Sequence, residues 1–316
     1  MKFQLNKDTS DAIKVVAALM VMFHHYSQYI CINQLSDSIF YKAMSAQAGF
    51  IGVAVFFFLS GYGLMESELK SHLTLKTFIK KRFLKVYLPV LLVTAIWMLI
   101  SPFLLKNSLF IGQEFAIGGG NKLIISNILI NFGDEVLWFI KVLICLYASF
   151  YCFSIAQRLN KTLGESCLFI FATILTVIVA KYWAPFEAVS IPFFYVGIML
   201  SLSKELKTKS LILTSVIMCL IGFGLFIGFD KALAIHALIN VACMMALIFI
   251  LFIKSLNIKI PTIITALSFD IYLVHNKVLM TMKDNSDFVS LPLFVLFVLM
   301  ATITFYFLRS RIFKIK

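Results

Sequence analysis

Two basic side chains on one predicted helix are the first candidates for chemistry in this sequence. Lys14 and His25 are eleven positions apart, which at ~100° and ~1.5 Å per residue places them on one face, ~16 Å apart. An ionisable group inside an apolar helix is costly and usually faces the bundle interior or a watery cavity. Imidazole suits proton transfer near neutral pH, so the pattern favours a functional His25 over one that only packs. His24 points to a different face and is the weaker candidate, whereas Lys14 could equally extend toward the membrane surface.

A cluster of basic residues follows the second apolar run. Arg82 and Lys85 lie three apart and share a face if the segment is helical. The cluster fits an anchor at the cytoplasmic membrane surface that also contacts anionic lipids, which we favour for Lys70 and Lys76. It also fits a cradle for the phosphates of a soluble anionic donor. Between positions 70 and 85 its members are Lys70, Lys76, Lys80, Lys81, Arg82 and Lys85.

Two further segments place polar or aromatic groups within apolar runs. The run 52–67 contains Ser60 and Tyr62 among small residues that permit close helix packing. Packing alone would account for this run. Trp138 lies near the start of another apolar stretch, 135–156.

A fifth segment, SFDIYLVHNK, begins at Ser268. Ser268, Tyr272 and His275 follow i, i+4, i+7 spacing and share a helix face. Asp270 and Lys277, seven positions apart, are a candidate charge pair with a structural role. For His275, a functional role and an interfacial position weigh equally.

These side chains must be positioned by helices that cross a membrane. Hydrophobic residues make up 61% of the 316 and charged residues 14%, whereas a soluble domain is about half apolar and about a quarter charged. Apolar runs near the ~20 residues that span a bilayer predict an all-α bundle of about ten transmembrane helices. The expected spans are 11–31, 48–66, 86–105, 135–156, 166–184, 187–202, 210–228, 232–254, 261–281 and 289–309.

The distribution of charge predicts how this bundle is oriented. Lysine and arginine concentrate in the N-terminal arm, in alternate connections and in the C-terminal tail, which places both termini in the cytoplasm. Orientation therefore explains the net charge of +13, and no nucleic-acid partner is expected. The six cysteines show no C-x-x-C spacing, so neither a disulfide framework nor a metal site is expected. We expect residues 1–316 to form a single membrane domain without a removable signal peptide.

In their order, these segments resemble acyltransferase family 3, a family of integral membrane acyltransferases, from Lys14 to about Leu279. The family's first helix carries an arginine or lysine, ten residues and then a histidine, which Lys14 and His25 match. Its next helix ends in a G-x-x-x-F-F-x-x-S-G-aromatic run, and later W-F and Y-L-x-H stretches follow. The matching residues are Gly52, Phe56, Phe57, Ser60, Gly61 and Tyr62, then Trp138 and Phe139, then Tyr272, Leu273 and His275.

The resemblance departs from the family pattern at one charged position. An R-x-x-R motif leads to a proline in the family, and this chain offers Arg82, Lys85 and Pro89. Lysine keeps the charge but loses the two-pronged geometry of arginine. The soluble hydrolase-like domain that some members carry is not attached, which implies a standalone type.

The resemblance implies an acyl-CoA donor, most often acetyl-CoA, that arrives from the cytoplasm. Its binding site would comprise Arg82, Lys85, Lys81 and Ser60. The acceptor would be a hydroxyl of a carbohydrate or lipid-linked sugar, with His25 as its general base and Lys14 positioning the imidazole or the donor. Further substrate-binding or structural candidates are Tyr62, Trp138, Tyr272 and His275. A bacterial cytoplasmic membrane is the implied location, with membrane lipids as partners.

Two other functions compete with acyl transfer. A transporter or flippase of sugars or lipids would also use an intramembrane lysine and histidine, but two halves of similar pattern, which would support it, are not found in the sequence. A polymerase or structural component is less favoured, because the longest exported connection, 106–134, is only about thirty residues long.

Overall fold

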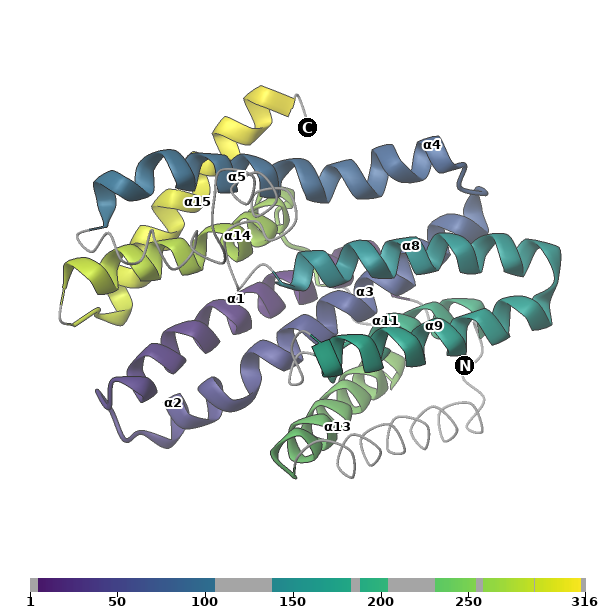
Figure 1. The fold of residues 1–316 in the computed structure, drawn as a ribbon, viewed down its shortest axis with the longest axis horizontal. Coiled ribbons are helices and arrows are strands. Elements are labelled where there is room, and N and C mark those ends of the chain that lie inside the picture. The colour runs from purple at the N-terminus through teal and green to yellow at the C-terminus, as the bar shows by residue number, and fades with distance from the viewer. Residues whose placement is uncertain are drawn as a thin grey trace. The chain divides into compact units, whose positions relative to one another are not determined.

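The computed structural model describes residues 5–105, 138–182, 188–203, 231–253, 258–286 and 288–313. All regular structure in these ranges is helical (Figure 1), and two of the helical segments are short π-helices. The predicted all-α fold is therefore confirmed.

Among the described residues, seven helical stretches are long and apolar enough to cross a membrane, and two shorter apolar helices accompany them. Together they correspond to nine of the ten expected spans; the remaining one, 210–228, lies outside the described residues. The chain is thus a multi-pass membrane protein, while the cytoplasmic location of both termini stays a prediction. The long stretches are Lys7–Ile32 (α1), Ile39–Lys70 (α2, Ile39–Ala43; η1, Met44–Ala48; α3, Gly49–Lys70), Leu84–Ser101 (in α5, Leu84–Leu104), Trp138–Leu159 (α8), Lys161–Lys181 (in α9, Lys161–Tyr182), Thr262–Asn285 (α14) and Leu291–Phe313 (α15). The shorter stretches are Pro192–Leu202 (in α11, Pro192–Ser203) and Ile235–Leu251 (in α13, Lys231–Ile253).

The helices group into two compact units. Unit 1 consists of Met1–Leu75 and Cys145–Pro261, and unit 2 of Lys76–Ile144 and Thr262–Lys316. The candidates Lys14, His25, Ser60 and Tyr62 therefore belong to unit 1, whereas the basic residues from Lys76 to Lys85 and the residues near His275 belong to unit 2. The single-domain organisation stays a prediction.

Glycines allow α3 to pack closely against two neighbours in unit 1. A side chain at Gly61 would overlap the backbone carbonyl of Phe194 on α11, and one at Gly197 of α11 would overlap the carbonyl of Phe58. At Gly52 the added Cβ would lie 2.8 Å from the carbonyl oxygen of Ala17 on α1. Small residues at these positions let the helix backbones approach each other, so Gly52 and Gly61 of the 52–67 run serve helix packing.

A carboxylate at the end of α3 fixes the turn that follows it. Glu68 is 5% exposed and accepts hydrogen bonds from the Arg158 side chain, at 2.8 Å, and from the backbone N–H of Leu73, at 2.9 Å. Arg158 also donates to the carbonyl of Leu73 at 3.1 Å. The ion pair with Arg158 and the hydrogen bond from Leu73 compensate the buried carboxylate for its lost hydration. These interactions also hold the turn 71–74 in place.

Unit 2 contains a buried ion pair between α14 and α15. The Asp270 side chain is 0% exposed, and its Oδ2 lies 2.8 Å from an Nη2 of Arg309 that is itself largely buried. The sequence interpretation paired Asp270 with Lys277, and the structure gives the carboxylate a different partner. The reason is that α14 packs against α15, the next helix along the chain, which brings together residues 39 positions apart, whereas i and i+7 positions are ~10 Å apart along one helix.

Candidate active site

His25 lies on α1 of unit 1 with its ring partly buried. Its Nδ1 is 3.1 Å from Oε1 of Gln28, one turn further along the same helix. When the Nδ1–H donates to that oxygen, the neutral ring keeps its lone pair on Nε2. A ring nitrogen with a lone pair and a fixed orientation is what a general base requires.

His24, the neighbouring ring, is packed into the protein instead. It is 4% exposed, and its Nδ1 lies 3.0 Å from the carbonyl oxygen of Met44 in η1. The ring rests against Gly49, where an added Cβ would come within 2.5 Å of its Cδ2. His24 therefore packs against the start of α3.

A third histidine of unit 1, His236 on α13, lies near this pair and was missed by the sequence reasoning. Its Nδ1 is 2.6 Å from Nε2 of Gln47 in η1. The rings of His236 and His24 both contact Phe50, with centroids 5.4 Å and 5.6 Å away. A histidine within an apolar run was the available signal for His236, the same signal that identified His25.

Lys14 is held away from His25. Its ammonium lies 2.9 Å from Oδ1 of Asp11, one turn toward the N-terminus of α1, and the side chain is 37% exposed. The His25 ring turns the other way along the helix, to Gln28. Of the two roles considered for Lys14, this arrangement suits contact with a donor better than contact with the imidazole.

Ser60 and Tyr62, the remaining candidates of unit 1, lie on α3. Ser60 is partly buried. The Tyr62 hydroxyl accepts a hydrogen bond from the backbone N–H of Leu5 at 3.2 Å, and its ring stacks on Phe58. Tyr62 thus fastens the segment that precedes α1 and has a clear structural task.

The basic segment of unit 2 contains a π-helical turn, η2 (Ile79–Phe83), between α4 (Leu75–Phe78) and α5. Arg82 is partly buried within this turn, and Lys85 is exposed on the first turn of α5. The Lys81 side chain lies outside the described part of the chain. A π-turn is wider than an α-turn. The relative directions of Arg82 and Lys85, three residues apart, therefore differ from those expected in a regular α-helix. Single π-turns are frequent at functional sites.

The late aromatic candidates come together in unit 2 as a packed group. Phe139, next to Trp138 on α8, contacts Tyr272 of α14 with ring centroids 5.2 Å apart, and Tyr272 lies 5.9 Å from the ring of His275. His275 is 0% exposed, and its Nδ1 is 3.1 Å from the carbonyl oxygen of Ile271. This environment suits a structural role for His275 better than exchange of protons with a substrate.

Comparison with families of known proteins gives one match that covers nearly the whole chain. Residues 8–309 match a family described as an acyltransferase domain. Searches of curated proteins and of solved structures yield no match. Within the described ranges, no three histidine, cysteine, aspartate or glutamate side chains gather as metal ligands. The chain belongs to acyltransferase family 3 and is a membrane acyltransferase.

Proposed function

We propose that this membrane acyltransferase moves an acyl group, with acetyl as the expected case, from cytoplasmic acyl-CoA to a hydroxyl of a cell-surface or lipid-linked carbohydrate. The hydrogen bond from His25 to Gln28 is the observation that carries the proposal. It favours the tautomer in which Nε2 can accept a proton from the acceptor hydroxyl.

In the proposed reaction, the acceptor oxygen attacks the carbonyl carbon of the thioester while its proton passes to Nε2 of His25. The tetrahedral species collapses, the carbon–sulfur bond breaks, and the thiolate of CoA takes the proton from the imidazolium. The products are the ester and free CoA, and His25 returns to its neutral form. No other reactant is needed.

The donor would be held by the basic segment of unit 2. Arg82 can hold a phosphate in two-pronged fashion, and Lys85, exposed at the start of α5, adds a point charge. Lys81 belongs to the same proposed group of donor contacts. Ser60 and Lys14 of unit 1 stay individual candidates for contact with the donor, and Lys14 is partly exposed beside Asp11.

The test is acyl transfer by purified protein in lipid nanodiscs, with radiolabelled acetyl-CoA and a glycan or lipid-linked sugar fraction as acceptor. His25→Ala is expected to lower the rate of transfer by about 10²- to 10⁴-fold, the usual contribution of a general base. His72→Ala is the matched control, because this ring lies on the turn after α3 and is 78% exposed.

The two variants must be compared at equal amounts of folded protein. Transfer by His25→Ala at the rate of the unaltered protein would exclude the proposed base. Transport of the sugar without any consumption of acetyl-CoA would exclude acyl transfer to that acceptor.

A further inference from the structure

Four ring side chains of unit 1 form a series of contacts that begins at His25. The centroid of its ring lies 5.0 Å from that of His24, and the ring of His24 lies 5.6 Å from Phe50. His236, on α13, completes the series at 5.4 Å from Phe50. Each pair of rings meets edge to face, an arrangement that aromatic rings favour. This ring series therefore connects the proposed base on α1 with a helix that lies much later in the chain.

The π-turn η1 makes a hydrogen bond to two members of the ring series. Nε2 of Gln47 lies 2.6 Å from Nδ1 of His236, and it must be the donor because an amide nitrogen has no lone pair to offer. The carbonyl oxygen of Met44 accepts from Nδ1 of His24 at 3.0 Å. One turn of the chain thus restrains both the ring beside His25 and the ring at the far end of the series.

The third ring, Phe50, is held through its backbone. Its carbonyl oxygen accepts a hydrogen bond from Ser190 Oγ at 2.9 Å, and Ser190 Oγ accepts one from Nδ2 of Asn240 at 3.2 Å. Asn240 lies one turn after His236 on α13. Two successive turns of α13 are therefore attached to the segment formed by η1 and the start of α3, which makes this part of unit 1 a rigid support.

A general base needs such a support, because its lone pair must meet the proton of the acceptor. A misplacement of ~1 Å can lower a rate by ~10²-fold. The hydrogen bond to Gln28 orients Nδ1 of His25, and the ring of His24 contacts the imidazole itself. The position of the base thus depends on the position of His24, which η1 and Phe50 determine.

We propose that Gln47 and His236 are positioning residues for His25. Their hydrogen bond holds η1 and the ring series in place, and the series keeps the imidazole where Nε2 meets the acceptor hydroxyl. The two residues act through His24 and need no contact with the substrate. This inference rests on the proposed function, because it requires His25 to be the base.

Kinetics of acetyl transfer in nanodiscs, with kcat and KM measured separately, test this role. Gln47→Leu and His236→Phe each remove the hydrogen bond and keep a side chain of similar size. We expect kcat to fall about tenfold in each, the equivalent of ~1.4 kcal/mol, with the KM for acetyl-CoA unchanged. The double variant should be no slower than the single ones, because all three lack the same bond. Losses that multiply in the double variant would overturn the proposal.

The His25→Ala background provides a readout that a merely structural role would not change. If the amide acts through the base, Gln47→Leu leaves the residual rate of His25→Ala unaltered, and a further tenfold loss there would contradict the proposal. An original rate in His25→Ala would overturn the proposed function and this inference together. Full kcat in Gln47→Leu beside a slow His25→Ala would overturn this inference alone.

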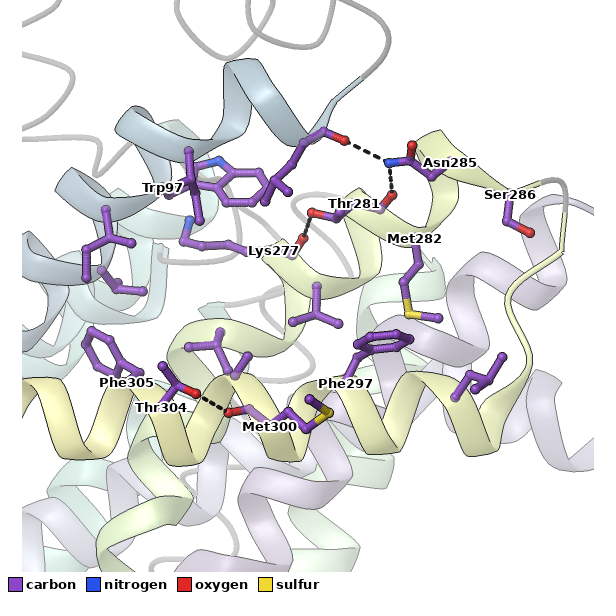
Figure 2. A pocket seen from close by; sticks show the side chains of 18 of the residues that line it. Trp97, Lys277, Thr281, Met282, Asn285, Ser286, Phe297, Met300, Thr304 and Phe305 are labelled. Atoms are coloured by element: carbon purple, nitrogen blue, oxygen red, sulfur yellow. Dashed lines mark hydrogen bonds between the residues drawn. The ribbon is translucent and has the colours of Figure 1, made fainter.

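Two control variants remove comparable hydrogen bonds outside the ring series. Tyr195→Phe, matched to His236→Phe, removes the bond of 3.0 Å between Tyr195 and Ser149, which joins α11 to α8. Asn285→Leu, matched to Gln47→Leu, removes an amide that donates to the carbonyl of Leu104 at 2.8 Å, at a pocket of unit 2 (Figure 2). Both controls should lower thermal stability and retain kcat. An equal loss of kcat in the controls would reflect general loosening of the fold and overturn the proposal.

Discussion

Two histidines of this protein share a local arrangement and differ in their access. His25 in unit 1 and His275 in unit 2 each turn Nδ1 to an oxygen one helical turn away, Oε1 of Gln28 and the carbonyl of Ile271. His275 is fully buried among aromatic rings, whereas His25 is partly exposed. The comparison teaches that an imidazole in an apolar run identifies a residue worth testing, and that the burial of the residue distinguishes the candidate base from the packed histidine.

Removing each ring should therefore have opposite consequences, and this is the largest effect we expect. His25→Ala should lower the rate of acyl transfer by about 10²- to 10⁴-fold with little change in thermal stability. His275→Ala should leave a cavity in unit 2 and lower stability by about 2–5 kcal/mol, while folded protein keeps its kcat. Both quantities can be measured on one nanodisc preparation, by radiolabel transfer and by thermal unfolding. A lower kcat in folded His275→Ala would break the comparison.

The buried ion pair of unit 2 should produce the next largest effect. Asp270→Asn leaves the guanidinium of Arg309 without its carboxylate, so we expect a loss of about 3–5 kcal/mol in the free energy of unfolding. The double variant Asp270→Asn with Arg309→Met should recover part of that loss, because no uncompensated charge remains. Denaturant unfolding in detergent measures all three proteins. Equal stability of the single variant and the unaltered chain would show that the pair is unimportant.

A smaller effect is expected from the partner of His25. Gln28→Leu keeps the approximate size of the side chain and removes the oxygen that accepts from Nδ1. Loss of one hydrogen bond worth ~1.4 kcal/mol lowers kcat about tenfold, with the KM for acetyl-CoA unchanged. Gln28→Glu, which restores an acceptor, should recover most of the rate. If leucine and glutamate variants have the same rate, the hydrogen bond does not orient the ring.

The ion pair between Lys14 and Asp11 on α1 should give the smallest effect. Asp11→Asn keeps the shape of the Asp11 side chain, which is 12% exposed, and removes its charge; Lys14 is 37% exposed and can turn to solvent, so we expect a loss of only about 1 kcal/mol. Thermal stability should thus change little, whereas Lys14→Met should raise the KM for acetyl-CoA if the ammonium contacts the donor. An unchanged KM in Lys14→Met would remove Lys14 from the proposed site.

Most of the helices could be predicted, because the length and apolar content of a membrane-spanning segment can be read directly from a continuous stretch of sequence. The π-turns could not, since 44–48 and 79–83 differ from α-helix only in hydrogen-bond register. For the same reason, the contact of His24 with Met44 was not foreseen. A pattern along one helix also says little about partners on another, which is why Asp270 was assigned to Lys277 and not to Arg309.

The proposed site, too, could be predicted from the sequence only in part. The i, i+11 spacing on α1 directed attention to His25, which the structure shows partly buried with its Nδ1 at Gln28; its catalytic role stays a prediction. Gln28 and Asp11, three residues from the two candidates, were available in the sequence, but each side chain could have adopted several rotamers. His236 reaches the neighbourhood of His24 only through the packing of unit 1, which no local pattern encodes.

Chemical rescue of the His25→Ala variant tests the central claim most directly. Added imidazole can enter the space left by the side chain and accept the proton of the acceptor hydroxyl. We predict that the rate of radiolabelled acetyl transfer rises with imidazole concentration in His25→Ala and does not rise in the unaltered protein. If folded His25→Ala transfers acetyl at the original rate, or if it is inactive and imidazole at any concentration restores nothing, then His25 is not the base.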